Sequence, residues 1–153
     1  MQHFIGTYEC KADAKGRIMI PVSLKKQMHE GLNDGFVIKR AVFNACLELY
    51  PMKQWEALME KVNALNRFNK KNNDFIRRFT AGVRLVDIDA TGRLLIPKDL
   101  MLHAGIERQT VISSAVNILE IWDKQRYEEA ISEAALDFGA LAEEVMGDKD
   151  DQD

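Results

Sequence analysis

The sequence predicts an α+β fold built from two tandem ββαββ units, each followed by a longer helix. The strongest observation is an internal repeat, because DAKGRIMIP at 13–21 returns as DATGRLLIP at 89–97 with six of nine positions identical. LELY at 47–50 likewise returns as LEIW at 119–122, and Trp55 and Tyr127 then hold equivalent places. With 153 residues, 46% of them hydrophobic, the chain can bury the core of one compact domain or of two small fused modules.

The elements of the first unit follow from its local signals. Residues 8–13 and 17–20 are expected as strands, and the turn Ala14-Lys15-Gly16 between them predicts a hairpin, because glycine supplies the positive φ of a tight turn. Pro21 should start a short helix over 22–29, which Gly31 is expected to terminate. Two β-rich runs, 36–42 and 46–50, complete the unit.

The second unit repeats this order. Pro97 should start a helix over 98–103 that ends at Gly105, and strands are expected at 110–116 and 118–122. These signals divide the chain into a first module (5–52), a helical connection (53–80), a second module (81–124), and a C-terminal helix with an acidic tail (125–153).

The two trailing helices carry different apolar patterns. The first has a stripe expected to cover a sheet, formed by Trp55, Leu58, Met59, Val62 and Leu65. The second has a seam in alternating steps of four and three, formed by Tyr127, Ile131, Ala134, Phe138, Leu141 and Val145. Such a seam is typical of lengthwise helix packing, either on a partner helix or within the chain.

Charge is distributed unevenly along the chain. The net charge of -3 by itself argues against nucleic-acid binding. However, residues 1–79 hold 14 Lys/Arg against 8 Asp/Glu, whereas residues 80–153 hold 7 against 16. Ten of these acids fall in 128–153, which ends in GDKDDQD, expected to be a solvated, disordered tail.

Several classes of function find no support in the sequence. Cys10 and Cys46 form neither a disulfide framework nor a paired metal motif, so both are interpreted as core residues of a protein in a reducing interior. No apolar run is long enough to cross a bilayer and no secretory leader is evident, so a soluble, cytoplasmic protein is expected. Isolated histidines and the absence of phosphate-loop or nucleophile motifs predict no enzyme, metal, cofactor or small-molecule substrate.

The repeated Asp-x-x-x-Arg motif is the candidate functional feature. Across a three-residue connection Asp13 faces Arg17, and Asp89 faces Arg93, so each carboxylate can hold a guanidinium and the turn amides. Each pair could serve only to stiffen its turn, which is the favoured interpretation for the second copy.

The surroundings of the first motif favour a role in binding a polyanion. It is accompanied in sequence by lysines where the second copy has acidic, polar or apolar residues. These positions are Lys11, Lys15, Lys25 and Lys26, matched by Asp87, Thr91, Met101 and Leu102.

A second basic stretch lies in the connection, with Asp74 as the opposing acid. Its cations are expected on the exposed face of a helix, with accessory contact to a nucleic-acid backbone as the alternative. They are Lys61, Arg67, Lys70, Lys71, Arg77 and Arg78. The side chains expected to be buried there are Val62, Leu65, Phe68, Phe75 and Phe79.

Taken together, the doubled D-A-x-G-R-[IL]-x-[IV]-P, the LELY/LEIW strands and the aromatic-led helices resemble the MraZ family over nearly the whole chain. The resemblance implies an AbrB-like double swapped-hairpin barrel, in which the two units of one chain interlock. It also implies a ring-shaped homo-oligomer in the nucleoid that binds repeated boxes in double-stranded DNA, upstream of the division and cell-wall gene cluster and its own promoter.

Carried over residue by residue, the resemblance assigns the DNA-facing role to Asp13, Lys15, Gly16 and Arg17, with Asp89, Gly92 and Arg93 as equivalents in the second copy. Lys11 is added for phosphate attraction. Two alternatives remain, a ring-forming interaction scaffold that binds no DNA and an antitoxin-type protein that neutralises a partner. Antitoxins of this type usually have a single module, so the presence of a second copy argues against the antitoxin alternative.

Overall fold

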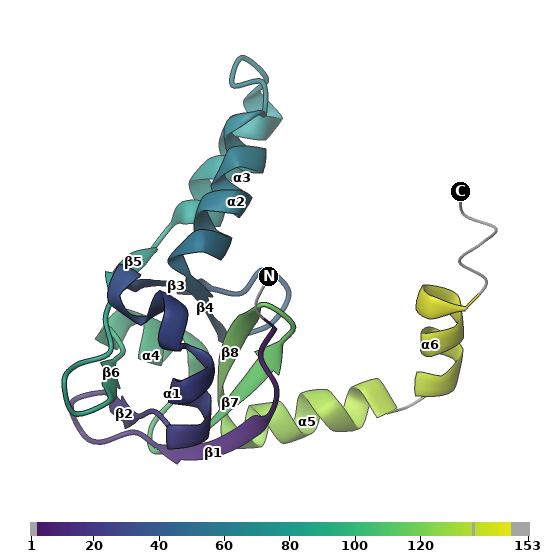
Figure 1. Ribbon diagram of the computed structural model, residues 1–153. Helices are drawn as coiled ribbons and strands as arrows, with labels where there is room; N and C mark the ends of the chain where they lie inside the picture. The colour runs from purple at the N-terminus through teal and green to yellow at the C-terminus, as the bar shows by residue number, and fades with distance from the viewer. Residues whose placement is uncertain (1–2, 136, 148–153) are drawn as a thin grey trace.

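The computed structural model describes residues 3–135 and 137–147. Its elements follow the predicted α+β order in both copies (Figure 1). The first copy contains β1 (Thr7–Lys11), β2 (Arg17–Met19), α1 (Val22–Gln27), the 3-10 helix η1 (His29–Asp34), β3 (Phe36–Arg40) and β4 (Leu47–Pro51). The second contains β5 (Arg84–Val86), β6 (Arg93–Leu95), α4 (Lys98–Ala104), β7 (Gln109–Ala115) and β8 (Ile118–Asp123). The helices α2 (Met52–Asn63) and α3 (Lys70–Thr80) connect the copies, and α5 (Lys124–Ala135) and α6 (Phe138–Met146) follow the second.

The two copies interlock through their strands. A six-stranded sheet has the order β1-β7-β8-β4-β3-β5, and a separate two-stranded ribbon joins β2 to β6, all pairs antiparallel. The first strand of each copy therefore pairs with the β-hairpin of the other copy, and the second strands pair with each other. One core fills the space between, because buried residues of both copies, among them Ile18 and Leu94, pack in a single cluster. Neither copy could bury this apolar surface alone.

The prediction that the first two strands of each copy pair with each other along their length is wrong. Within a copy the two segments share the isolated bridge Ala12↔Ile18, or its equivalent Ile88↔Leu94, and the hydrogen bonds that close the turn. Beyond that bridge β1 pairs with β7 and β2 pairs with β6, because Ile18 and Leu94 gain complete burial only between the copies. The turn is formed as expected, and its two arms lead into different sheets.

The predicted helix stop at Gly105 is confirmed, and the predicted stop at Gly31 is wrong. Gly105 ends α4 in the left-handed conformation, with φ of 66°. Gly31, in contrast, lies inside η1, and the backbone reaches positive φ at Gly35, so Gly31 does not terminate the first helical segment. The first copy is longer by four residues between the shared motifs, and η1 occupies that length.

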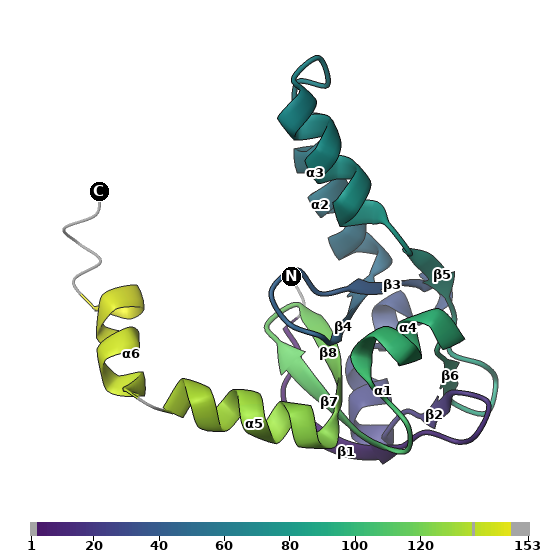
Figure 2. The same cartoon turned by 180° about the vertical axis from the view of Figure 1, so that it is seen from behind.

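The connection is a helical hairpin rather than one covering helix. In both views α2 and α3 run side by side and project from the sheet (Figures 1 and 2). Val62 is buried, but Phe68 at the tip is fully exposed and Phe75 is 46% exposed, so the expectation that both are buried is wrong. The hairpin is held to the sheet at its base, where Trp55 packs edge-on against Tyr50 with ring centroids 5.5 Å apart.

The same aromatic contact recurs in the second copy with the residue types exchanged. Tyr127 on α5 packs edge-on against Trp122 on β8, with ring centroids 5.8 Å apart. This pair supports the predicted equivalence of Trp55 and Tyr127. Cys10 and Cys46 are both buried free thiols, as expected for core residues.

The predicted continuous seam of the last helix is interrupted. Asp137 adopts a left-handed conformation with φ of 66° and separates α5 from α6, so Ile131 and Phe138 do not lie on one helix. The break therefore removes the basis for one lengthwise seam. The acidic tail at 148–153 lies outside the described residues.

The ribbon β2–β6 lies at one end of the body. In both views α5 and α6 extend from the opposite end, and the α2–α3 hairpin projects in a third direction (Figures 1 and 2). Among the described residues no helix is both long and apolar enough to span a membrane.

Candidate nucleic-acid interface

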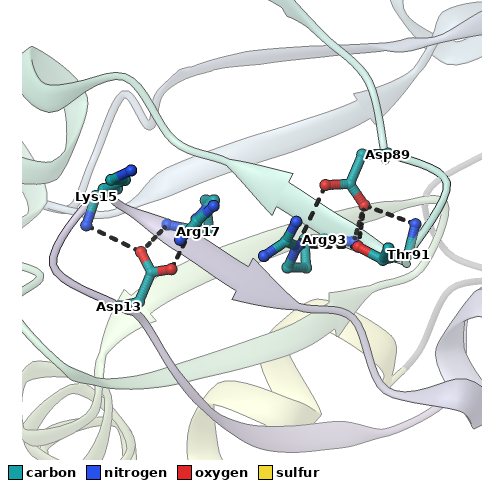
Figure 3. A network of polar contacts seen from close by, with 6 residues as sticks. All are labelled: Asp13, Lys15, Arg17, Asp89, Thr91 and Arg93. Atoms are coloured by element: carbon teal, nitrogen blue, oxygen red, sulfur yellow. Dashed lines mark hydrogen bonds and ion pairs between the residues drawn. The ribbon is translucent and has the colours of Figure 1, made fainter.

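The first Asp-x-x-x-Arg turn is closed by one carboxylate. Asp13 Oδ1 accepts hydrogen bonds from the backbone N–H groups of Lys15 and Arg17, both at 2.9 Å. Asp13 Oδ2 accepts from Arg17 Nε at 2.7 Å (Figure 3). The backbone closes the same loop, because Asp13 N donates to Arg17 O and Gly16 N donates to Asp13 O. Asp13 therefore fixes both the turn and the direction of the arginine.

The second turn repeats this arrangement with one added group. Asp89 Oδ1 accepts from the backbone N–H groups of Thr91 and Arg93 at 2.9 Å and from Thr91 Oγ1 at 2.7 Å. Arg93 Nε lies 3.3 Å from Asp89 Oδ2 and 2.9 Å from Thr91 Oγ1. Arg93 Nε therefore donates to both the threonine hydroxyl and the carboxylate, and its distance to the carboxylate is longer than that of Arg17 in the first turn.

Each turn is hydrogen-bonded to the backbone of the other copy. Gly16 and Gly92 have φ values of 87° and 86°, a backbone conformation that favours glycine. Ile96 N donates to Gly16 O and Ile20 N donates to Gly92 O, both at 2.9 Å. The two turns are consequently parts of one rigid unit at the ends of the ribbon.

These contacts lower the pKa of both aspartates. The pKa of Asp13 lies below its ordinary value, mainly because of the hydrogen bond from the Arg17 backbone N–H. The pKa of Asp89 falls to about 2, chiefly through the Arg93 backbone N–H and then the Thr91 hydroxyl. Both carboxylates are therefore ionised at neutral pH and available to orient an arginine.

The outward face of the ribbon presents four side chains. The register pairs Arg17 with Leu95 and Met19 with Arg93, while the intervening pair Ile18 and Leu94 is fully buried. Alternation along the strands therefore places both arginines and both apolar residues on the exposed side. Figure 3 shows the Arg17 and Arg93 side chains lying between the two turns.

The lysines do not all gather where the sequence suggested. Lys15 is exposed on the first turn, and Lys11 is exposed beside it, where it lines a shallow depression with Asp13 and Arg108. Lys25, in contrast, belongs to the second turn, since its Nζ lies 3.4 Å from the position that a Cβ would take on Gly92.

The neighbour of Gly16 is Met101 of the other copy, whose Sδ lies 2.7 Å from the equivalent Cβ position. Lys26 lies elsewhere and lines a pocket of about 660 Å³ with Pro51 and Asn117. The expectation that Lys25 and Lys26 surround the first motif is therefore wrong. Interlocking exchanges the helices that flank the turns, so the basic and apolar neighbours are exchanged as well.

The structure brings the predicted residues Asp13, Lys15, Gly16, Arg17 and Arg93 onto one ribbon with its two turns, with Lys11 at its margin. The position of Lys25 at the second turn and the exposed positions of Met19 and Leu95 on the ribbon are not among the sequence-based expectations. The strand sequences Arg-Ile-Met and Arg-Leu-Leu indicate the exposure of Met19 and Leu95. In a β-strand, a residue two places after an arginine lies on the same face as that arginine.

The amino-acid sequence matches a known protein family in both copies. The family model described as "MraZ protein, putative antitoxin-like" matches residues 3–78 and again 79–149. A protein of Christiangramia forsetii named "Transcriptional regulator MraZ" is 64% identical over 150 residues, 98% of this chain and 97% of that protein. A Flavobacterium psychrophilum protein of the same name is 63% identical over 153 residues, 100% of this chain and 98% of that protein.

A more distant relative, from Bacteroides fragilis and also named "Transcriptional regulator MraZ", is 38% identical over 147 residues, 95% of this chain and 92% of that protein. The two tandem matches coincide with the two interlocked copies, and the relatives align over the full chain. The chain therefore belongs to the MraZ family.

Proposed function

We propose that this protein is a sequence-specific regulator of transcription that binds double-stranded DNA through the β2–β6 ribbon and its two Asp-x-x-x-Arg turns. The observation that carries the proposal is the outward face of the ribbon, where two arginines held by aspartates lie between two turns, the first carrying Lys15 and the second approached by Lys25 of α1. Relatives at 63–64% identity are named transcriptional regulators, which supports the same role here.

The arginines are the central binding groups. A two-stranded β-ribbon fits the major groove of B-DNA, where an arginine can donate two hydrogen bonds to guanine. Arg17 Nε is held by Asp13, and the fork of the guanidinium is directed by that contact. Arg17 therefore reads a base edge or grips a phosphate, and Arg93 does the same from the second turn.

The lysines supply attraction to phosphates. Lys11 and Lys15 serve the first turn, and Lys25 serves the second from α1 of the other copy. This arrangement extends the site to both turns, although Thr91 and Asp87 replace two of the lysines in the second copy. Such contacts give affinity without sequence preference, and the ribbon adds the preference.

The wider assignment rests on family membership. We propose a double swapped-hairpin barrel with modules at 5–52 and 81–124, a helical connection at 53–80 and a C-terminal segment at 125–153. The exchange of strands between the copies supports that fold. We further propose a homo-oligomeric ring in the cytoplasm, associated with the nucleoid and acting on the division and cell-wall gene cluster and on its own promoter. Several weak ribbons bound to repeated boxes would then act together by multivalency.

A gel-shift series tests the proposal. The full chain is titrated against the DNA upstream of its own gene and against a scrambled duplex, over a range of salt concentrations. We expect preference for the upstream DNA and an affinity that falls steeply with salt through counterion release. Arg17→Ala should weaken binding by about 1–3 kcal/mol if Arg17 reads a base.

The opposite outcome is equally clear. Absence of binding to either duplex at low salt would contradict DNA recognition and favour an interaction scaffold or a partner-neutralising protein. Equal binding to both duplexes would reduce the function to unspecific DNA association. Unchanged binding by Arg17→Ala would remove Arg17 from the mechanism.

A further inference from the structure

We infer that Met19 and Leu95 distinguish thymine from cytosine by contacting the thymine C5-methyl group in the major groove. This inference rests on the proposed function, since it requires the β2–β6 ribbon to enter DNA, and it names what the ribbon reads besides guanine. Nothing in the family match or in the names of the relatives assigns a role to these two residues.

The exposure of the two side chains is the first observation. Met19 is 55% exposed and Leu95 is 54% exposed, whereas Ile18 and Leu94 between them are completely buried. The ribbon thus has an apolar inner face that the core requires and two apolar groups on the outer face that the core does not use. Single exposed apolar residues are common on proteins, so exposure alone would decide nothing.

Their position relative to the arginines is the second observation. Leu95 is the direct cross-strand partner of Arg17, and Met19 is the direct cross-strand partner of Arg93. Side chains so paired have Cβ atoms about 4.5–5.5 Å apart. Whatever the two arginines bind, the two apolar side chains therefore touch a neighbouring part of the same surface.

The charge around the patch indicates which partner this is. Met19 and Leu95 lie between the first turn, which carries Lys15, and the second turn, which Lys25 of α1 approaches. The two aspartates of the turns are occupied by the arginines and by turn amides. A face with two arginines and two apolar side chains, flanked by two lysines, complements a groove flanked by phosphates. Lysines at both ends of the face suit the phosphates on either side of such a groove.

The chemistry of the groove then specifies the contact. Among the groups that base pairs present in the major groove, the thymine C5-methyl is the apolar one, and guanine offers the acceptors that arginine prefers. An outer face with arginine and apolar side chains side by side therefore matches guanine and thymine edges together. Cytosine in place of thymine presents neither the methyl group nor the same pattern of hydrogen-bonding groups.

The test removes the methyl group and leaves the hydrogen-bonding pattern unchanged. The upstream DNA fragment that binds in the gel shift is prepared with deoxyuridine in place of thymidine inside the region that the protein protects. A second probe carries the same replacement only outside that region. For the native protein we expect the first probe to bind about three- to fourfold more weakly for each methyl contacted, and the second probe to bind normally.

Variants connect the effect to the two side chains. Met19→Ala and Leu95→Ala should each weaken binding to the thymine probe, and the double variant should bind thymine and uracil probes equally. The controls are Val22→Ala on α1 and Leu102→Ala on α4, which are 70% and 82% exposed but lie outside the ribbon. Both controls should keep the native ratio of thymine to uracil binding. Met19→Leu should retain most of it, since it preserves an apolar contact.

If the native protein binds both probes equally while Arg17→Ala still abolishes the preference for upstream DNA, methyl recognition is overturned and the proposed function stands. If the alanine variants change the oligomer mass in light scattering and leave the thymine-to-uracil ratio unchanged, the patch is a contact between copies and the inference is overturned. If no duplex binds, the proposed function fails and the inference fails with it.

Discussion

The backbone N–H of Ile20 donates to the carbonyl oxygen of Gly92 at 2.9 Å, so the second strand of one copy closes on the turn of the other. The reciprocal bond joins Ile96 to Gly16 at the same distance. Because each of these bonds joins residues of different copies, the geometry of the candidate site depends on the assembly of both copies.

Gly16→Ala should destabilise the protein more than Gly92→Ala. Both positions have positive φ, which costs an alanine about 1–2 kcal/mol. A Cβ on Gly16 would also lie 2.8 Å from the carbonyl oxygen of Ile96, a backbone atom that cannot move freely, whereas on Gly92 it would meet the end of Lys25 at 3.4 Å. Overpacking adds about 1–3 kcal/mol at Gly16 alone. Urea unfolding of the two variants measures the difference, and equal losses would contradict the backbone contact.

Lys25→Ala should reduce the salt dependence of DNA binding, and Lys26→Ala should not. Lys25 lies against the second turn, while its neighbour in sequence lines a separate pocket. Loss of one phosphate contact lowers the slope of log affinity against log salt by about one. Gel shifts across a salt series give the slope for each variant. If Lys26→Ala lowers the slope and Lys25→Ala does not, α1 approaches DNA by the face that carries Lys26.

Asp13→Asn should weaken DNA binding although it removes a negative charge from a surface that meets a polyanion. The reason is that Asp13 holds Arg17 Nε at 2.7 Å and also accepts two turn amides. We expect a loss of roughly fivefold, the lower end for a misplaced base-reading arginine. The matched control is Asp87→Asn, which removes a charge at an exposed site in the second copy and should leave binding equal or stronger. Tighter binding by Asp13→Asn would mean that the carboxylate merely repels DNA.

Acidification should loosen the second turn only at very low pH. The pKa of Asp89 is about 2, below its ordinary value of 3.8, so the turn stabilisation it provides is complete above pH about 4 and is lost as the pH falls towards 2. Carbon-13 NMR of the side-chain carboxyl follows this titration directly. Thr91→Ala should raise the pKa of Asp89, because it removes the hydrogen bond from the Thr91 hydroxyl at 2.7 Å. The same variant should leave the pKa of Asp13 unchanged. A native Asp89 that titrates at its ordinary value would contradict the hydrogen-bonded turn.

Local signals were sufficient for much of the fold. The repeat predicted two units with the same element order, and the Asp-x-x-x-Arg spacing predicted a carboxylate that meets both an arginine and the turn amides. Gly105 was a correct helix stop because its conformation is set by its own residue type. These features depend on interactions within a few residues, and their energies are therefore encoded in short stretches of sequence.

Other features could not be obtained in this way. The partners of β1 and β2 lie in the other copy, and a local turn signal does not state where its two arms pair. Phe68 and Phe75 followed a helical apolar pattern, yet the chain folds back at 64–69 and leaves them exposed. The seam after Tyr127 was similarly interrupted by the left-handed residue Asp137.

The units, the turns and the residue types that they offer follow from the amino-acid sequence, because hydrogen bonds across three or four residues and strand alternation are local interactions. Which helix flanks which turn, and which side chains share the outer face of the ribbon, follow from the packing of the two copies against each other. Ile18 and Leu94 are completely buried because the two copies exchange strands. That exchange carries Lys25 to the second turn and Met101 to the first, a placement that no spacing within either copy reveals.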